Sequence, residues 1–352
     1  MNEILVVSTD GLGDMIMRLP FIKCAVRYSK KNNIKINFVL ASKIEQSALE
    51  NLIDFSDIEY NIYNCGGNQS KKFWLNFLRI GLAMRNKISD CYIIDGRDRN
   101  LMVLFFKLLN AKRYYGLINC KNKNSRIRKY LDNRFIDSSV ICHKTLVSLE
   151  FCKFLKEKGK IEDIYCAVKE HIVKINDDKK HIIIAPSSGG QQWKLWPVKN
   201  YIKLVHDLLH KYPDIKISFI GAGNDKIALD FLSHEFNKVC MIYYNKPINQ
   251  IRSLLYSSNL FISADCGALH LASTIQDLPI IGLFGPTNCM LTGPILDNVN
   301  IIKSNLECSP CFDHRVGKFE CNNIICMKSI TPEIVMRKIE EVLFNEQQTK
   351  IH

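Results

Sequence analysis

The sequence lacks any long apolar run. No window of the 352 residues approaches the roughly 20 consecutive apolar residues that a membrane-spanning helix needs. The first residues, MNEILVVSTDGLGD, also lack the basic start, apolar run and small-residue cleavage site of a secretory leader. We therefore expect a cytoplasmic protein without a membrane span.

Paired cysteines are scarce along most of the chain. Of the 14 cysteines, ten are spaced singly from Cys24 to Cys289, a pattern typical of reduced thiols in a cytosolic core. A disulfide framework is therefore not expected.

Only the last four cysteines cluster, and the sequence leaves their role open. Cys308, Cys311, Cys321 and Cys326 form the pattern C-x2-C-x9-C-x4-C, with His314 as a spare ligand. The first pair has the spacing of a thiolate metal site, whereas the second pair is irregular for a zinc ribbon. The cluster either holds a structural metal or stabilises a loop as reduced thiols.

Acidic residues are too few to balance the basic ones in the first half of the chain. Residues 1–176 hold 30 Lys and Arg against 18 Asp and Glu, a net charge of +12, whereas residues 177–352 hold 18 against 17, a net charge of +1. This excess indicates an anionic partner for the first half, such as nucleic acid, a membrane surface or a phosphorylated substrate. The basic stretch at residues 112–134, with Arg126, Arg128 and Lys129, is either a solvated loop or the place where an acidic acceptor binds.

The overall composition is ordinary for a globular protein, with 47% hydrophobic and 24% charged residues. The length favours two domains, and a polar window at residues 176–180 divides the chain into 1–176 and 177–352. Strands are expected at residues 3–8, 35–40, 60–63, 91–95, 181–185, 215–220, 239–243, 260–264 and 279–284, alternating with helices. This alternation predicts an α/β protein with parallel sheets.

The stretch LFISADCGALHLASTIQDLPIIGLFGP, residues 260–286, has the pattern of a strand, a polar loop, a helix and a second strand. The first strand stops at Asp265, and the helix begins beyond Gly267. Free amides and the positive end of a helix dipole suit a phosphate. Asp265, Cys266, Gly267 and His270 are therefore candidates for an anion site. The alternative is an ordinary crossover with a polar turn.

A second polar loop, TDGLGD, follows the strand at residues 3–8. Gly11 and Gly13 lack the third glycine of a dinucleotide-binding fingerprint, so this motif alone is weak. Asp14 lies at the mouth of the next helix, where a carboxylate is either a helix cap or a base that faces a cleft.

A third polar loop, PSSGGQQWKLWP at residues 186–197, combines the hydroxyl groups of Ser187 and Ser188 with the charge of Lys194. This set suits a diphosphate, although Trp193 and Trp196 in the same loop serve packing on the simpler interpretation. Further along, Asp225 ends the sequence GAGND and either bonds a ribose hydroxyl or starts its helix.

In this order, the loops GLGD (11–14), PSSGGQQWKLWP, DCGALHLA (265–272) and LFGPT (283–287) resemble those of glycosyltransferase family nine, the bacterial heptosyltransferases. The resemblance spans nearly the whole chain. It implies a GT-B fold, in which two Rossmann-like domains with parallel sheets face each other across a cleft. The acceptor site then belongs to the N-terminal domain and the nucleotide-sugar site to the C-terminal one. The last helix either stays with the C-terminal domain or packs back on the N-terminal one.

The resemblance also implies ADP-heptose as donor, inversion at the anomeric carbon and no catalytic metal, and no Asp-x-Asp motif occurs at a strand end. Many family members have a hydroxyl residue where Cys266 stands, so the contact expected here is that of the backbone amide. The candidate residues are Asp14 and Lys194 for catalysis; Gly13, Ser187, Ser188, Lys194, Asp225, Asp265, Cys266, Gly267 and His270 for the donor; and Arg126, Arg128 and Lys129 for the acceptor.

The sequence thus predicts an inverting glycosyltransferase that moves heptose from ADP-heptose to an anionic lipopolysaccharide core, in peripheral contact with the inner face of the inner membrane. Two enzyme alternatives are a protein heptosyltransferase of the autotransporter type and a relative that uses another sugar nucleotide. A basic nucleotide- or RNA-binding module is the alternative without catalysis. The joint presence of Asp14, Lys194 and Asp265 argues against that module.

Overall fold

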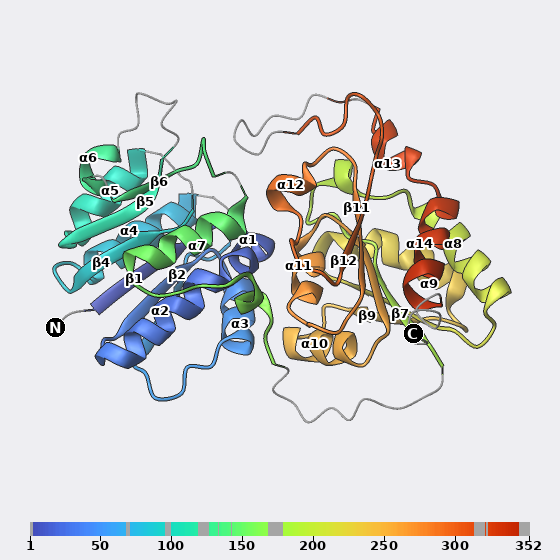
Figure 1. Cartoon of the computed structure of the whole chain (residues 1–352), viewed down its shortest axis with the longest axis horizontal. Coiled ribbons are helices and arrows are strands. Elements are labelled where there is room, and N and C mark those ends of the chain that lie inside the picture. The colour runs from blue at the N-terminus through green and yellow to red at the C-terminus, as the bar shows by residue number, and fades with distance from the viewer. Residues whose placement is uncertain are drawn as a thin grey trace, which may run out of the picture. The chain divides into compact units, whose positions relative to one another are not determined.

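The computed structural model describes residues 3–67, 71–95, 100–118, 127–132, 134–141, 143–167, 179–312, 321 and 323–344. The chain forms two compact units, Met1–Ile164 and Tyr165–His352 (Figure 1). The domain boundary expected between residues 176 and 177 lies outside the described residues. Within the described ranges, no helix is both long and apolar enough to cross a membrane.

In the described part of the N-terminal unit, six strands form a parallel sheet in the order β3-β2-β1-β4-β5-β6. The strands are β1 (Glu3–Ser8), β2 (Ile36–Leu40), β3 (Tyr60–Asn64), β4 (Ile88–Ile93), β5 (Arg113–Ile118) and β6 (Phe135–Asp137). The helices are α1 (Leu12–Met17), α2 (Leu19–Asn32), α3 (Lys43–Leu52), α4 (Lys71–Ala83), α5 (Asn100–Leu109), α6 (Arg128–Leu131), α7 (Lys144–Phe154) and the 3-10 helix η1 (Ile161–Ile164).

The contacts of successive β4 side chains show that the helices form two layers, one on each face of the sheet. Cys91 and Ile93 belong to the apolar cluster formed with α4, α5 and α6. The intervening Tyr92 instead lies against Phe21 of α2, with 5.3 Å between the ring centroids. Because successive side chains of a strand point to opposite faces of the sheet, α4 to α6 cover one face and α2 the other, together with α7 (Figure 1).

Two expectations for the N-terminal unit need correction. The stretch at residues 112–134, which has weak periodicity, contains β5 and α6 rather than a continuous loop. The one helix expected after the TDGLGD loop is two helices, α1 and α2, separated at Arg18. Pro20 lies in the first turn of α2, where its missing N–H leaves no helical hydrogen bond unmade.

The described part of the C-terminal unit has a second parallel sheet, in the order β12-β11-β10-β7-β8-β9. The strands are β7 (His181–Ala185), β8 (Lys216–Gly221), β9 (Met241–Tyr244), β10 (Leu260–Ala264), β11 (Ile280–Phe284) and β12 (Val299–Lys303). The helices are η2 (Gln192–Lys194), α8 (Val198–Lys211), η3 (Gly223–Asp225), α9 (Lys226–Phe236), α10 (Ile248–Tyr256), α11 (Gly267–Ser273), α12 (Cys289–Thr292), α13 (Ile325–Ser329) and α14 (Pro332–Leu343).

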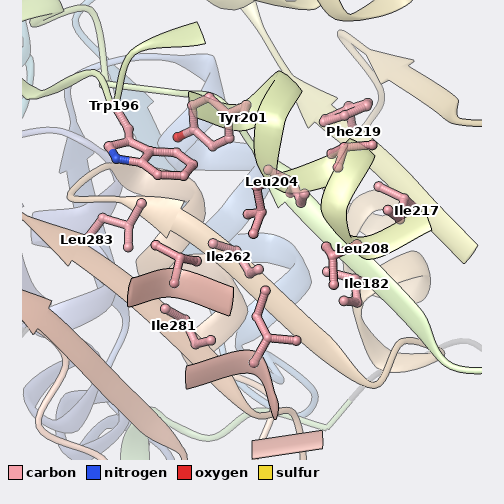
Figure 2. Packing of buried hydrophobic residues seen from close by; sticks show 14 of the residues in the cluster. Ile182, Trp196, Tyr201, Leu204, Leu208, Ile217, Phe219, Ile262, Ile281 and Leu283 are labelled. Atoms are coloured by element: carbon pink, nitrogen blue, oxygen red, sulfur yellow. The ribbon is translucent and has the colours of Figure 1, made fainter. Parts of the chain in front are cut away.

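The core of the C-terminal unit is organised around Trp196, which is fully buried (Figure 2). Its ring lies 4.7 Å from that of Tyr201, and its Nε1 donates a hydrogen bond to the Ile330 carbonyl over 2.6 Å. Trp196 is therefore a packing residue, as the simpler interpretation of this loop proposes. Val335 and Ile339 belong to the same core, so α14 packs against α8 within the C-terminal unit.

The two faces of α5 give a stability prediction for the N-terminal unit. Phe105 is fully buried and stacks on Phe77, with 4.1 Å between the ring centroids, whereas the neighbouring Leu104 is 41% exposed. We expect Phe105→Ala to lower the free energy of unfolding by about 3 to 5 kcal/mol, because it leaves a cavity in a packed core. Leu104→Ala is the matched control and should change it by less than about 0.5 kcal/mol. Urea unfolding measures both, and equal losses would contradict the layer assignment.

Candidate active site

The strand order of each sheet reverses next to its first strand, between β1 and β4 in one unit and between β7 and β10 in the other. Ligands of open α/β sheets bind beyond the carboxyl ends of the strands at such a switch point. The loop after β1 leads to Asp14, and the loops after β7 and β10 contain Ser187 and Asp265. The topology therefore places each predicted loop at the binding edge of its own sheet.

Asp14 lies in the first turn of α1, but it does not cap that helix in the way the alternative interpretation proposes. The N-cap is Gly11, without a side-chain cap bond, and the Asp14 carboxylate accepts a hydrogen bond from Lys144 at the start of α7. His143 caps α7 by accepting the Thr145 N–H on Nδ1 over 3.1 Å, which fixes the position of Lys144. Asp14 remains 24% exposed and so is open to a substrate. Its catalytic role stays a prediction.

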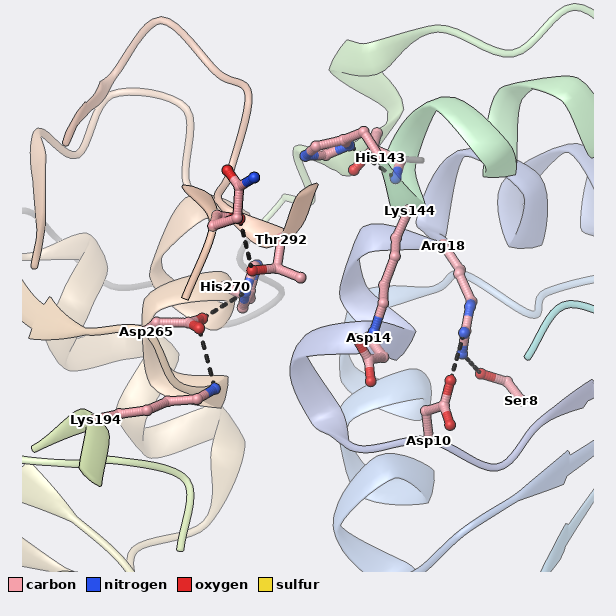
Figure 3. A network of polar contacts seen from close by, with 12 residues as sticks. Ser8, Asp10, Asp14, Arg18, His143, Lys144, Lys194, Asp265, His270 and Thr292 are labelled. Carbon is pink, nitrogen blue, oxygen red and sulfur yellow. Dashed lines mark hydrogen bonds and ion pairs between the residues drawn. The ribbon is translucent and has the colours of Figure 1, made fainter. Parts of the chain in front are cut away.

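A buried arginine fixes the same edge of the N-terminal sheet. Arg18 donates to Asp10 Oδ2 over 2.6 Å and to Ser8 Oγ over 3.2 Å (Figure 3). Burial alone would lower the pKa of Arg18, but the carboxylates of Asp10, Asp14 and Asp95 outweigh burial and raise it. The Thr9 N–H bonds Asp95 Oδ2 over 2.9 Å and so ties the end of β1 to the end of β4.

None of these partners of the GLGD loop was predicted from the sequence. Lys144 is 130 residues from Asp14, and Asp95 is 86 residues from Thr9. No local pattern joins residues so far apart. The one local signal was the eight-residue spacing of Arg18 from Asp10, across the loop and α1.

In the C-terminal unit, the loop after β7 contacts the loop after β10. Ser187 and Ser188 are buried, and Gly189 and Gly190 have φ angles of 60° and 82°, a conformation that side chains rarely adopt. A Cβ atom on Gly189 would lie 3.9 Å from the Cβ of Cys266. The two predicted donor loops are thus brought together.

Cys266 itself turns its side chain toward the sheet. Its thiol lies 3.1 Å from Ser263 Oγ, and burial raises the pKa of the thiol. It forms the N-cap of α11 without a side-chain cap bond, and Gly267 is the first residue of that helix. The backbone amides of this turn are therefore what the residues offer a ligand, as expected from the sequence.

The centre of the C-terminal site is a buried ion pair between Lys194 and Asp265 (Figure 3). Lys194 Nζ lies 3.0 Å from Asp265 Oδ2, and His270 Nε2 lies 3.9 Å from Oδ1 of the same carboxylate. Burial alone would raise the pKa of Asp265, but the charges of Lys194 and His270 outweigh burial and lower it. Asp265 itself would repel a diphosphate, so its role in the site is to position the side chains of Lys194 and His270.

Asp225 and Gly13 are the two remaining donor candidates. The Asp225 carboxylate accepts the Ala222 N–H over 3.0 Å, and bonds from Ser187 and Ser188 also favour its charged form, although burial outweighs them and raises its pKa. Asp225 therefore orders the serine loop, and its ribose contact stays a prediction. Gly13 lies beside Asp14 in α1 of the N-terminal unit, and its donor contact stays a prediction.

The acceptor candidates are described in part. Arg126 lies outside the described residues, whereas Arg128 and Lys129 are the first two residues of α6. The Arg128 guanidinium lies 5.5 Å from the centroid of the Phe135 ring, and Lys129 Nζ lies 5.3 Å from that of Tyr130. Their contact with an acceptor stays a prediction.

The C-terminal cysteines gather beside Gly285. Ser309 Oγ donates to the Gly285 carbonyl over 2.5 Å, and a Cβ atom on Gly285 would lie 3.1 Å from Cys326 Sγ. Burial, then the neighbouring thiols, raise the pKa of Cys311. Among the described residues, no group of three or more His, Cys, Asp or Glu side chains is arranged to hold a metal ion.

These observations leave the role of the cysteine cluster open. His314, the spare ligand, lies outside the described residues, while Cys308 is exposed and Cys321 half-buried. A structural metal held by Cys308, Cys311, Cys321 and Cys326 therefore stays a prediction, as does the alternative of reduced thiols.

Comparisons with known proteins concern the family and the fold. The model of glycosyltransferase family 9 (heptosyltransferase) matches residues 156–319, a little under half of the chain. This segment is therefore similar to glycosyltransferases of that family. Lipooligosaccharide heptosyltransferase 2 of Haemophilus influenzae is 26% identical to this chain over 155 residues, which are 43% of each protein. The aligned stretch thus spans less than half of that relative.

Solved structures of similar fold cover nearly the whole chain. ADP-heptose LPS heptosyltransferase II of E. coli has a TM-score of 0.69 at 16% identity, with 98% of this chain and 99% of that chain covered. E. coli heptosyltransferase WaaC with ADP has a TM-score of 0.70 at 16% identity, with 96% and 99% covered. At such identities the likeness concerns the fold, and the predicted α/β GT-B fold is confirmed.

The buried ion pair predicts a pH dependence of stability. Because the folded-state pKa of Asp265 lies below the value of about 3.9 for an unfolded aspartate, its contribution is present above that pH and is lost as the pH falls through the folded-state pKa. Asp265→Asn should lower the free energy of unfolding at neutral pH by about 3 to 5 kcal/mol, because it leaves Lys194 buried without its partner. The variant should also lose less stability than the wild type on acidification.

Urea unfolding between neutral and acidic pH measures this difference. The exposed Asp277→Asn is the matched control and should follow the wild type at every pH. If the free energy of unfolding of Asp265→Asn fell with pH in the same way as that of the wild type, the Asp265 carboxylate would not cause the pH dependence assigned to it.

Proposed function

We propose that the chain transfers heptose from ADP-heptose to an anionic lipopolysaccharide core, with inversion at the anomeric carbon. The observation that carries the proposal is the Lys194–Asp265 pair beside the serine and glycine loop after β7. The relatives named above are heptosyltransferases, and one of their structures holds ADP. The proposed place of action is the inner face of the inner membrane.

On the donor side, Lys194 is the proposed contact of the diphosphate. Its ammonium group is held by Asp265 and lies at the end of η2, so it is oriented before the donor binds. As the bond between the sugar and the diphosphate breaks, negative charge grows on the leaving oxygen, and fixed donors stabilise it. The hydroxyl groups of Ser187 and Ser188 and the loop amides supply the other donors. This chemistry requires no catalytic metal.

On the acceptor side, Asp14 is the proposed base. Inverting transfer needs one carboxylate to accept the proton of the acceptor hydroxyl while its oxygen forms the new bond to the anomeric carbon. The bond from that carbon to the diphosphate breaks, and its electron pair leaves with ADP. Lys144 holds the Asp14 carboxylate in place for this step.

The proposal of an anionic acceptor rests on the positive charge of the N-terminal half. Residues 1–176 have a net charge of +12, and Arg128 and Lys129 start a helix on that unit. Exposed cations attract the phosphate groups of an acidic core and lose this attraction at high salt. A protein acceptor is the enzyme alternative, and it is distinguished by turnover on each acceptor class.

Replacing the proposed base tests the mechanism. We expect Asp14→Asn to lower turnover by roughly 10²- to 10⁴-fold, as is typical for the loss of a general base, with the affinity for ADP-heptose nearly unchanged. Asp57→Asn, at an exposed position of the same unit, is the control and should keep normal turnover. Initial rates and calorimetric titration measure both quantities. Near-normal turnover of Asp14→Asn would exclude Asp14 as the base.

Donor binding is tested separately. ADP-heptose should raise the melting temperature more than UDP- or GDP-sugars do, because a ligand that binds only the native state stabilises it. Lys194→Ala should weaken ADP-heptose binding and also slow transfer, since the charge it stabilises grows in the transition state. Lys199→Ala, exposed on the following helix, is the matched control. If another nucleotide sugar raised the melting temperature more than ADP-heptose does, that sugar nucleotide would be the donor instead. If Lys194→Ala bound ADP-heptose as tightly as the wild type, Lys194 would not belong to the donor site.

A further inference from the structure

The solvent side of α4 and α5 combines exposed leucines with cations. Leu75 and Leu82 on α4 are 50% and 55% exposed, and Leu104 on α5 is 41% exposed. Exposed cations lie on the same two helices. The α4–α5 face is defined by Lys71, Leu75, Arg79, Leu82, Leu104 and Lys107. Large apolar side chains in such a group mark a surface that meets a partner, whereas single exposed ones do not.

These residues form one surface because the two helices are closely packed. Phe77 of α4 stacks on Phe105 of α5 at 4.1 Å, and a Cβ atom on Gly81 would lie only 2.8 Å from Phe105. Both helices cover the same face of the N-terminal sheet (Figure 1). On α4, the exposed positions 71, 75, 79 and 82 follow the spacing of one helical stripe.

The α4–α5 face is also free of acidic residues. Residues 71–87 hold five Lys and Arg and no Asp or Glu, and residues 100–113 hold three and none. Of these eight cations, Arg113 is paired, with Asp90 Oδ1 at 2.6 Å. The neighbouring α6 adds Arg128 and Lys129, and Phe106 of α5 contacts Tyr130 of α6. These three segments thus hold ten of the 30 Lys and Arg residues of the N-terminal half and none of its acidic residues.

We propose that the α4–α5 face docks on the surface of an anionic lipid bilayer. Leu75, Leu82 and Leu104 enter the headgroup region, and the cations lie beside the lipid phosphates, as in amphipathic helices that lie in a membrane interface. A second copy of the chain is a poorer fit, because two such faces would bring like charges together. Nucleic acid would leave the leucines without an apolar partner. The proposal rests on the proposed place of action at the inner membrane and names the surface of the chain that makes the contact.

Co-sedimentation of the full chain with lipid vesicles tests the proposal. The wild type should bind vesicles of phosphatidylglycerol and phosphatidylethanolamine and bind phosphatidylcholine vesicles much more weakly. The double variant Leu75→Ser/Leu82→Ser should bind the anionic vesicles at least about tenfold more weakly, because it removes the apolar contacts. Arg79→Gln/Lys107→Gln should weaken binding at least about tenfold at low salt, with a smaller difference at high salt.

The chain offers a matched control on α9. Ile227 and Phe231, four residues apart on one face of the helix, are 65% and 61% exposed, but their helix also carries Asp230 and Glu235. Ile227→Ser/Phe231→Ser should therefore bind vesicles like the wild type. Thermal unfolding confirms that each variant is folded, which is expected because all the replaced side chains are exposed.

Three results would overturn the proposal. The wild type could fail to bind anionic vesicles, the leucine variant could bind them like the wild type, or sedimentation equilibrium could show a dimer that the leucine variant alone dissociates. The last result would assign the face to a second copy. Transfer to a water-soluble core acceptor should be normal in the face variants and lost in Asp14→Asn. Failure of docking and failure of the transfer proposal are therefore separable.

Discussion

Asp265 is charged and almost completely buried at the carboxyl end of β10, and the arrangement of the C-terminal site depends on how that charge is offset. A lone carboxylate in this position would be costly, because burial removes its hydration. Lys194 at 3.0 Å and His270 at 3.9 Å compensate it. Lys194 can do so only if the loop after β7 runs toward β10, which brings Ser187 and Gly189 against Cys266. One ion pair thus fixes the positions of η2, the serine loop and the start of α11.

The N-terminal unit also has a buried charge at the end of its sheet, but here the buried group is a cation and its partners are carboxylates. The buried cation is Arg18, and Asp10 and Asp95 are among the carboxylates that stabilise its charged form. Asp14 lies at the mouth of this network and is held from a second helix by Lys144. A carboxylate fixed in this way, and still partly exposed, is suited to act on a substrate without moving. Each unit therefore has a buried charge near its switch point that is compensated by groups of opposite sign.

Charge is distributed differently in the two units. The site of the C-terminal unit is built from a few buried charges within a nearly neutral half, as befits a compact, defined ligand. The N-terminal half has a net charge of +12, much of it exposed on α4, α5 and α6. Exposed charges of one sign act over the distance of a Debye length and favour extended anionic partners. This contrast supports a small donor for one unit and a large acidic acceptor for the other.

The sequence by itself determined the alternation of strands and helices, the three polar loops and most of the donor candidates, because periodicity and short motifs are local properties. It missed β5, β6 and β12. In β5, five of the six residues from Arg113 to Ile118 are buried or half-buried and give no alternation. Only the tertiary structure decided the partners of the charges. Lys194 meets Asp265 across 71 residues and Lys144 meets Asp14 across 130, and such pairs exist only once the sheets and helices have packed. For the same reason, only the folded chain showed that Leu75 and Leu82 face solvent while Phe77 beside them is buried.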